Sequence, residues 1–117
     1  RATLESVAYQ SNDLFYSMNK DGLKPRIVKI DGGMITNNWF SQFLANIINL
    51  KVLRPKILET TAFGAALLAG YQIGEFKSLN HIKNTWRKDK EFVPKIDKKL
   101  RNHLLQGWQQ AIKKTLA

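Results

Sequence analysis

Apolar positions recur at helical spacing in three segments of this chain, which predicts amphipathic helices over residues 3–19, 36–49 and 97–116. The residues expected to face inward on helix 3–19 are Leu4, Val7, Ala8, Phe15 and Met18. On helix 36–49 they are Trp39, Phe40, Phe43, Leu44, Ile47 and Ile48. On helix 97–116 they are Leu100, Leu104, Trp108, Ala111 and Ile112. Asp97 suits the cap position of the last helix. A further helix is predicted over 59–73. Because its middle, 62–70, is apolar all round, we expect it to be buried, with small residues that admit a close neighbour.

Two short apolar runs predict strands over residues 26–31 and 51–53, the second stopped by Arg54-Pro55. A short helix is expected over 78–85 and an extended segment over 92–94. Strands that alternate with helices favour an α/β fold, with helices around a short parallel sheet. The 117 residues form one domain at most, and two strands make a poor sheet. Since the chain also begins without Met, we expect it to be part of a longer protein.

The first strand ends in Asp31-Gly32-Gly33, shortly before the predicted start of a helix at Thr36. Glycine lets the backbone approach a ligand closely, and the helix N-terminus offers free N–H groups and a positive dipole end. Gly32 and Gly33 are therefore candidates for a phosphate or nucleotide cradle. The alternative is that they only make a strand-to-helix turn.

Three polar residues near these glycines have two readings each. Asn37, expected in the first turn of the helix, could reach a ligand on the glycines through its amide, or could cap the helix. Asp31 could bind magnesium through water or could stabilise the turn. Glu59 could be a catalytic residue or a helix-start residue, and we favour the helix start. No catalytic triad, carboxylate pair or Walker P-loop is evident in the sequence, so we assign no catalytic residue.

Composition and charge narrow the function classes. The chain has no Cys, which excludes disulfides and fits a reducing compartment, and no apolar run is long enough to span a bilayer. Its net charge is +10, of which +8 falls in residues 76–117. Because positive charge attracts nucleic acid, an alternative is that the chain is a non-enzymatic nucleic-acid-binding module. We favour the interpretation that these basic residues form a solvent-exposed surface, because basic and aromatic residues are not interleaved as in a groove that binds single-stranded nucleic acid.

In this order and spacing, the motifs resemble the C-terminal domain of the FGGY carbohydrate kinases along nearly the whole chain. The motifs that carry the resemblance are the helix at 1–10, Asp31-Gly32-Gly33 with Asn37-Asn38, Gln42-Phe43, 52–55, 59–62 and the glycine-alanine helix at 64–70. Residues 92–94 and 107–111 are similar to the tails of the family's glycerol-phosphorylating members. Two positions depart from the usual pattern, Asn46 for Asp and Asn49 for Gly, and we expect effects on packing or turn shape only.

The resemblance implies an actin-like (ribonuclease H-like) ATPase fold, of which residues 1–117 form the C-terminal portion of the second, nucleotide-binding domain, with a basic helical tail at 76–117. It implies ATP-dependent phosphorylation of glycerol, or of another sugar or polyol, with Mg²⁺ as a cofactor in the complete enzyme. It also implies that Gly33, with Gly32, contacts the nucleotide through its backbone and that Asn37 contacts the adenosine.

In the family, the catalytic Asp, the glycerol-binding residues and the first phosphate loop precede the segment that corresponds to this one. We therefore expect the 117 residues to be inactive alone. We also expect a cytoplasmic protein that self-associates or forms homo-oligomers, since an unpaired sheet edge and apolar surface would be exposed.

Overall fold

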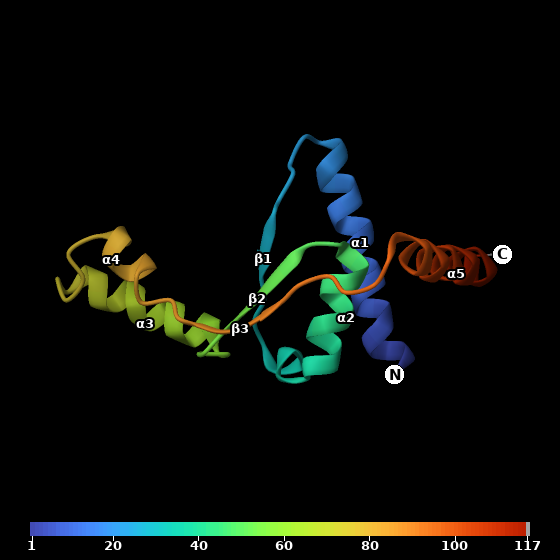
Figure 1. Ribbon diagram of the computed structural model, residues 1–117. Coiled ribbons are helices and arrows are strands. Elements are labelled where there is room, and N and C mark those ends of the chain that lie inside the picture. Colours follow the sequence, from blue (N-terminus) through green and yellow to red (C-terminus); the bar gives the residue numbers. More distant parts are fainter. Residues whose placement is uncertain (117) are drawn as a thin grey trace.

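A computed structural model describes residues 1–116 of the chain (Figure 1). In chain order the elements are α1 (Ala2–Lys20), β1 (Ile27–Lys29), the 3₁₀ helix η1 (Gly33–Thr36), α2 (Asn38–Ile48), β2 (Lys51–Pro55), α3 (Thr60–Gln72), α4 (Leu79–Lys83), β3 (Lys88–Phe92) and α5 (Lys98–Leu116). The expected α/β fold is confirmed. Among these residues, no helix has both the length and the apolar character that a membrane crossing requires.

The sheet has three strands in the order β1-β2-β3. β1 and β2 are parallel, with Val28 opposite Val52, as the alternation of strands and helices predicted. β3 is antiparallel to β2, with Val52 opposite Phe92, so the sheet is mixed and not purely parallel. The sequence predicted only an extended segment near Phe92. The strand was missed because β3 reads Lys-Asp-Lys-Glu-Phe and exposes its first four residues, which gives no apolar alternation.

β2 is longer than predicted, since it continues through Arg54 and Pro55 to its end. The expected stop at Pro55 was wrong for a simple reason. Proline lacks an N–H but is tolerated at strand ends and irregularities, and the register of β2 against β3 shifts between Arg54 and Pro55. The extension places the Arg54 side chain beside η1, which matters for the site below.

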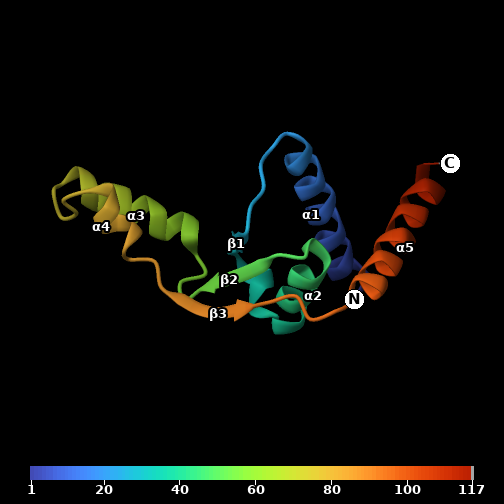
Figure 2. The same cartoon turned by 45° about the horizontal axis from the view of Figure 1, so that its top comes forward.

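The core lies where α1 and α2 pack together beside the sheet (Figure 2). Its buried residues are Ala8, Tyr9, Ile35, Phe40, Leu44, Ala45, Ile47, Ile48, Val52 and Phe92. The predicted inward face of α2 is therefore largely confirmed. Trp39 is an exception, because it is 42% exposed at the first turn, where its ring stacks on Phe43.

Helix α3 was expected to be buried, and the structure contradicts this. None of its residues is buried, and Leu68 is 62% exposed. Figures 1 and 2 show α3 and α4 together as an arm that extends away from the sheet, on the side opposite α5. Within residues 1–116, α4 is the main element that packs on α3, so most of its apolar surface stays uncovered. The small residues were expected to let α3 approach another element closely, but the close contact at Gly70 is with the segment that follows the helix, since an added Cβ would lie 2.7 Å from the Phe76 ring.

Helix α5 forms a second arm, on the other side of the sheet (Figure 2). Asp97 caps it as predicted, with its Oδ1 accepting the Leu100 N–H at 2.7 Å. Trp108 joins it to α1 by stacking on Tyr9, with ring centroids 5.4 Å apart. Leu100 and Ala111 were expected to face inward but are exposed. The two arms give a radius of gyration of 17.2 Å, whereas about 13 Å is typical of a compact domain near this length.

Asn46 and Asn49, the two departures from the family pattern, both have structural roles. Asn46 is buried, and its Oδ1 accepts hydrogen bonds from Gln42 and from the Lys95 N–H, which ties α2 to the segment after β3. Asn49 ends α2 with φ 55° and ψ 40°. Asparagine tolerates this left-handed conformation better than most residues, so it replaces the usual glycine.

Candidate functional site

The glycine pair lies where the chain leaves β1 and turns into η1. Gly32 has φ 88° and ψ 171°, a conformation that strongly favours glycine. Its N–H donates to the Leu58 carbonyl at 3.2 Å, so the turn is fastened to the loop between β2 and α3. Gly33 then begins η1. Thus Gly32 makes the turn, and Gly33 is not required for its backbone angles.

Open space surrounds both glycines. A Cβ added at Gly32 or Gly33 would meet no atom within 4 Å. In addition, the Gly33 N–H makes no hydrogen bond to any acceptor in the described part of the chain. A ligand could therefore reach this backbone directly, which is the chemistry that the sequence predicted for the pair.

Asn37 is the N-cap of α2 rather than part of its first turn. Its Oδ1 accepts the N–H groups of Trp39 at 2.9 Å and Phe40 at 3.2 Å. The capping reading of Asn37 is therefore correct as far as the side-chain oxygen is concerned. The other end of the amide, Nδ2, donates to no acceptor within residues 1–116. It lies one turn of η1 beyond Gly33 and keeps both of its protons for another partner.

Asp31 connects the turn to the start of α3. One of its carboxylate oxygens accepts a hydrogen bond from the Thr60 hydroxyl, at the start of α3. Glu59 is the N-cap residue of that helix but makes no side-chain capping bond, in agreement with its reading as a helix-start residue. Across residues 1–116, no group of three or more His, Asp or Glu side chains is arranged to hold a metal ion.

Sequence reasoning missed Arg54, although it lies against the glycine turn. Its guanidinium donates to the carbonyls of Ile35 and Thr36 and to Asn38, all in or next to η1. In the sequence, Arg54 was interpreted as part of a strand stop and of the family motif at 52–55, without a role at the site. Its position next to the turn depends on the pairing of β2 with β1, which the local pattern does not contain.

The groups with displaced pKa values lie away from the turn. Burial raises the pKa of Tyr9 and lowers that of the Arg101 guanidinium, which donates to the Ile47 carbonyl and Asn12. Hydrogen bonds from Lys51 and Lys88 lower the pKa of Glu91. These shifts therefore describe packing and ion pairing and not the chemistry of the candidate site.

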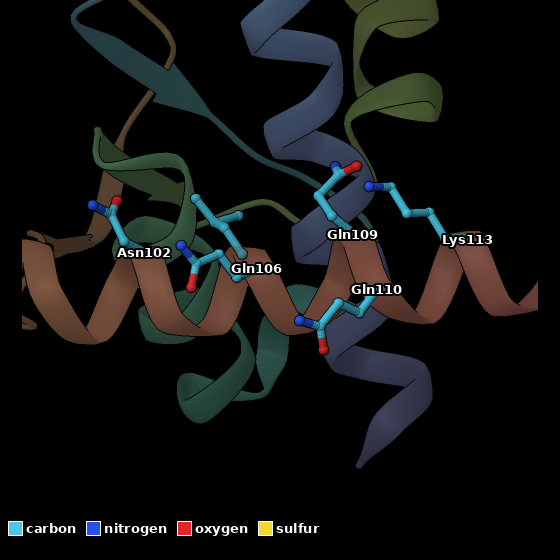
Figure 3. Close-up of a pocket in the computed structure, with 6 residues that line it drawn as sticks. Asn102, Gln106, Gln109, Gln110 and Lys113 are labelled. Carbon is cyan, nitrogen blue, oxygen red and sulfur yellow. The ribbon is translucent and has the colours of Figure 1, made fainter.

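The hollow shown in Figure 3 is also separate from the glycine turn, since all of its lining residues belong to α5. Asn102, Gln106, Gln109 and Gln110 present side-chain amides along the helix, and Lys113 closes one end. It contains none of the candidate nucleotide-binding residues, although Gln109 and Gln110 belong to the 107–111 segment that resembles the family.

With this geometry established, three comparisons identify the chain's relatives. Residues 1–73 match the FGGY family of carbohydrate kinases, C-terminal domain. A glycerol kinase of Gluconobacter oxydans is 48% identical over 117 residues, which is 99% of this chain and 23% of that protein. The chain thus spans about a quarter of the length of such relatives.

Solved structures indicate the same family as the sequence comparisons. The crystal structure of Plasmodium falciparum glycerol kinase with ADP matches all of this chain and 24% of that one, with 38% identity and a TM-score of 0.84. A ligand-bound xylulose kinase from Lactobacillus acidophilus, 22% identical, matches all of this chain and 24% of its own with a TM-score of 0.81, which shows a shared fold. This is the actin-like ATPase fold that the sequence motifs implied. The family match covers more than half of the residues, and the chain belongs to the FGGY family of carbohydrate kinases.

Proposed function

We propose that this chain is the nucleotide-binding portion of an ATP-dependent glycerol kinase, which converts ATP and glycerol into ADP and glycerol 3-phosphate. The support is the similarity along the whole chain to proteins named glycerol kinase, one of them solved with ADP. Residues 1–117 would be the C-terminal portion of the second domain, with the basic tail at 76–117. The rest of the protein would supply the catalytic base and the polyol pocket.

In this proposal Gly33 and Gly32 contact the nucleotide through their backbone, and Asn37 contacts the adenosine part. The observation that carries the assignment is the open space around both glycines together with the Gly33 N–H, which has no acceptor within residues 1–116. The Nδ2 group of Asn37 has no acceptor in the described structure and would donate to the nucleotide. The arrangement fits an adenine nucleotide because it offers donors and no side chain that blocks the approach.

Mg²⁺ would enter with the phosphates of ATP, whose charge it neutralises during phosphoryl transfer. Asp31 is the nearest carboxylate in sequence to the glycine pair, but one of its oxygens already accepts from Thr60. We therefore propose that residues elsewhere in the complete enzyme and water hold the metal. Phosphoryl transfer needs hydroxyl, base, metal and phosphate in one place, so the 117 residues alone would be inactive.

The test is an assay of glycerol-dependent ADP formation by the full-length protein, with xylulose, gluconate and other polyols in parallel. A clear preference for glycerol supports the proposal, whereas a preference for another polyol or sugar would assign a different kinase of the same family. No phosphorylation of any of these acceptors would refute the kinase function.

The similarity of the whole chain to glycerol kinases favours a kinase over a nucleic-acid-binding module. In addition, some of the basic residues, including Lys88 and Arg101 of the tail, are already engaged within the fold. Lys51 and Lys88 pair with Glu91, Arg54 pairs with Asp89, and Arg101 is engaged by main-chain and side-chain oxygens. Such residues are less available to bind phosphates of a nucleic acid. Fluorescence anisotropy with a labelled oligonucleotide at two salt concentrations tests this, because phosphate-driven binding weakens steeply with salt.

We further propose a cytoplasmic enzyme and homo-oligomerisation. For the 117 residues alone, self-association would use the outer edge of β1, which is an edge strand of the sheet, and the apolar surface of α3. Light scattering would show a mass above that of one chain. A monomer at high concentration would contradict this part of the proposal.

A further inference from the structure

We propose that Arg54 is a positioning residue for the nucleotide site, which holds η1 against the sheet so that Gly33 and Asn37 keep their places. Asp89 on β3 fixes the guanidinium in this role. The inference rests on the proposed function, because it concerns the same segment, but it assigns a task to a residue that does not itself contact the nucleotide.

The guanidinium of Arg54 reaches three acceptors on the segment that follows the glycines. Its Nη1 donates to the Ile35 carbonyl at 2.8 Å and to the Asn38 Oδ1 at 3.0 Å, with the Thr36 carbonyl at 3.4 Å. These three residues flank Asn37 on both sides. Displacement of the guanidinium would therefore release the backbone before Asn37 and the side chain of Asn38 after it.

Asp89 holds the other side of the guanidinium. The Arg54 Nε donates to the Asp89 Oδ2 at 2.8 Å, which joins β2 to β3. The Arg54 side chain is 12% exposed and the Asp89 side chain is 43% exposed, so water screens this pair mainly from the Asp89 side. Lysine could not reproduce the arrangement, because a single ammonium group cannot present a planar fork to η1 and Asp89 together.

A second side chain holds the same carbonyl and makes the inference testable. The hydroxyl of Ser41, which is fully buried, donates to the Ile35 oxygen at 3.1 Å from α2. The turn thus has one tether from α2 and another from β2. When Arg54 is replaced, Ser41 retains η1 near the core, so we expect a folded protein in which the turn is displaced by a small amount.

A small displacement matters for a binding backbone. Groups that orient a ligand lose much of their effect when they move by about 1 Å, even when the mutation lies outside the chemistry. The loss should fall on the nucleotide and not on glycerol, because the side-chain hydrogen bonds of Arg54 go to η1, Asn38 and Asp89. Its guanidinium also lies over the ring of Phe92, a core residue at the end of β3.

The experiment uses the full-length protein with ATP and glycerol as probes, and compares Arg54→Lys and Asp89→Asn with the wild type. We expect Arg54→Lys to raise the KM for ATP about tenfold, which corresponds to about 1.4 kcal/mol. Asp89→Asn should raise it less, because Arg54 keeps its bonds to η1. The KM for glycerol and the melting temperature should stay near the wild-type values. Arg26→Lys, at an exposed arginine before β1, is the matched control.

Gly33→Arg fills the proposed nucleotide space. It therefore distinguishes the assignment of the nucleotide site from the positioning role of Arg54. If Gly33→Arg raises the ATP KM while Arg54→Lys and Asp89→Asn leave it unchanged, the positioning role is overturned and the site assignment stands. Equal rises in the KM for ATP and for glycerol, or a loss of folded protein in both Arg54→Lys and Asp89→Asn, would also overturn it by showing a general structural role. If Gly33→Arg itself has no effect, the site assignment fails first.

Discussion

The Oδ1 atom of Asn37 accepts the Trp39 N–H at 2.9 Å, so the residue proposed to contact adenosine is also the cap of α2. The two tasks use different atoms of one amide. The oxygen satisfies N–H groups that the helix cannot pair internally, whereas the nitrogen has no acceptor within residues 1–116. Substitutions that change one end of the amide can therefore separate stability from binding.

Asn37→Asp should keep the cap and lose the nucleotide contact. A carboxylate accepts the Trp39 and Phe40 N–H groups as well as the amide does and suits the positive end of the helix. It has no proton to donate, so we expect a near-normal melting temperature with a raised KM for ATP in the full-length protein. Asn37→Ala should lose both the cap of α2 and the nucleotide contact, and the loss of the cap should lower the free energy of unfolding by about 1 kcal/mol. An unchanged ATP KM in Asn37→Asp would reduce the residue to a cap.

The two glycines should respond differently to substitution. Gly32 has a positive φ, so Gly32→Ala should lower stability by about 1 kcal/mol despite the space around it. Gly33 has no such constraint, and Gly33→Arg should leave the melting temperature close to that of the wild type while raising the KM for ATP. Thermal unfolding and ATP kinetics on both variants check this. A Gly33→Arg protein with normal ATP kinetics would mean that the space is not used by the nucleotide.

Local sequence patterns predicted the elements whose partners are near in the chain. The helical face of α2 and the cap at Asp97 follow from residues a few positions apart, and the structure confirms both. β3 was missed because its pairing depends on Glu91 and Asp89 meeting Lys51 and Arg54, more than thirty residues away. The burial expected for α3 was wrong because an apolar helix is buried only where another element covers it.

The same difference between local patterns and long-range pairing explains which parts of the candidate site could be predicted from the sequence. Asp31-Gly32-Gly33 is a local motif, and its turn and open surroundings are as predicted. Arg54 is adjacent to the site only through the parallel pairing of β1 and β2. The pattern of a single strand does not reveal which neighbouring turn its end will reach, so the residue was read as a strand stop.

Trp108 should anchor α5 to α1 through its indole N–H as well as its ring. Its Nε1 donates to the Asp13 Oδ2 at 2.8 Å. Trp108→Phe retains an aromatic ring to stack on Tyr9 but removes the indole donor, which leaves the Asp13 carboxylate with only the long hydrogen bond from Gln109 at 3.5 Å. A hydrogen bond to a charged group contributes about 1.5–3 kcal/mol, so hydrogen exchange of the amides in 98–116 should become faster. Trp39→Phe is the control, because the indole N–H of Trp39 makes no hydrogen bond in the described residues. Equal exchange in Trp108→Phe and wild type would contradict the anchor.

Glu91 should make the pairing of β2 with β3 sensitive to acid. Hydrogen bonds from Lys51 at 3.0 Å and Lys88 at 3.1 Å lower its pKa. Because the folded pKa lies below the unfolded one, the ionised carboxylate adds stability above the ordinary pKa of glutamate. That stability is lost as the pH falls through the lowered pKa.

Glu91→Gln should therefore lower the melting temperature slightly at neutral pH, and the difference from the wild type should vanish in acid. The effect should be small and should shrink with added salt, because all three side chains are partly exposed. Glu75→Gln makes the same change of charge at an exposed glutamate that forms no ion pair within residues 1–116. The measurement is a set of melting curves of the wild type, Glu91→Gln and Glu75→Gln at neutral and acidic pH. If Glu91→Gln and Glu75→Gln behave alike at both, the ion pairs contribute nothing measurable to the sheet.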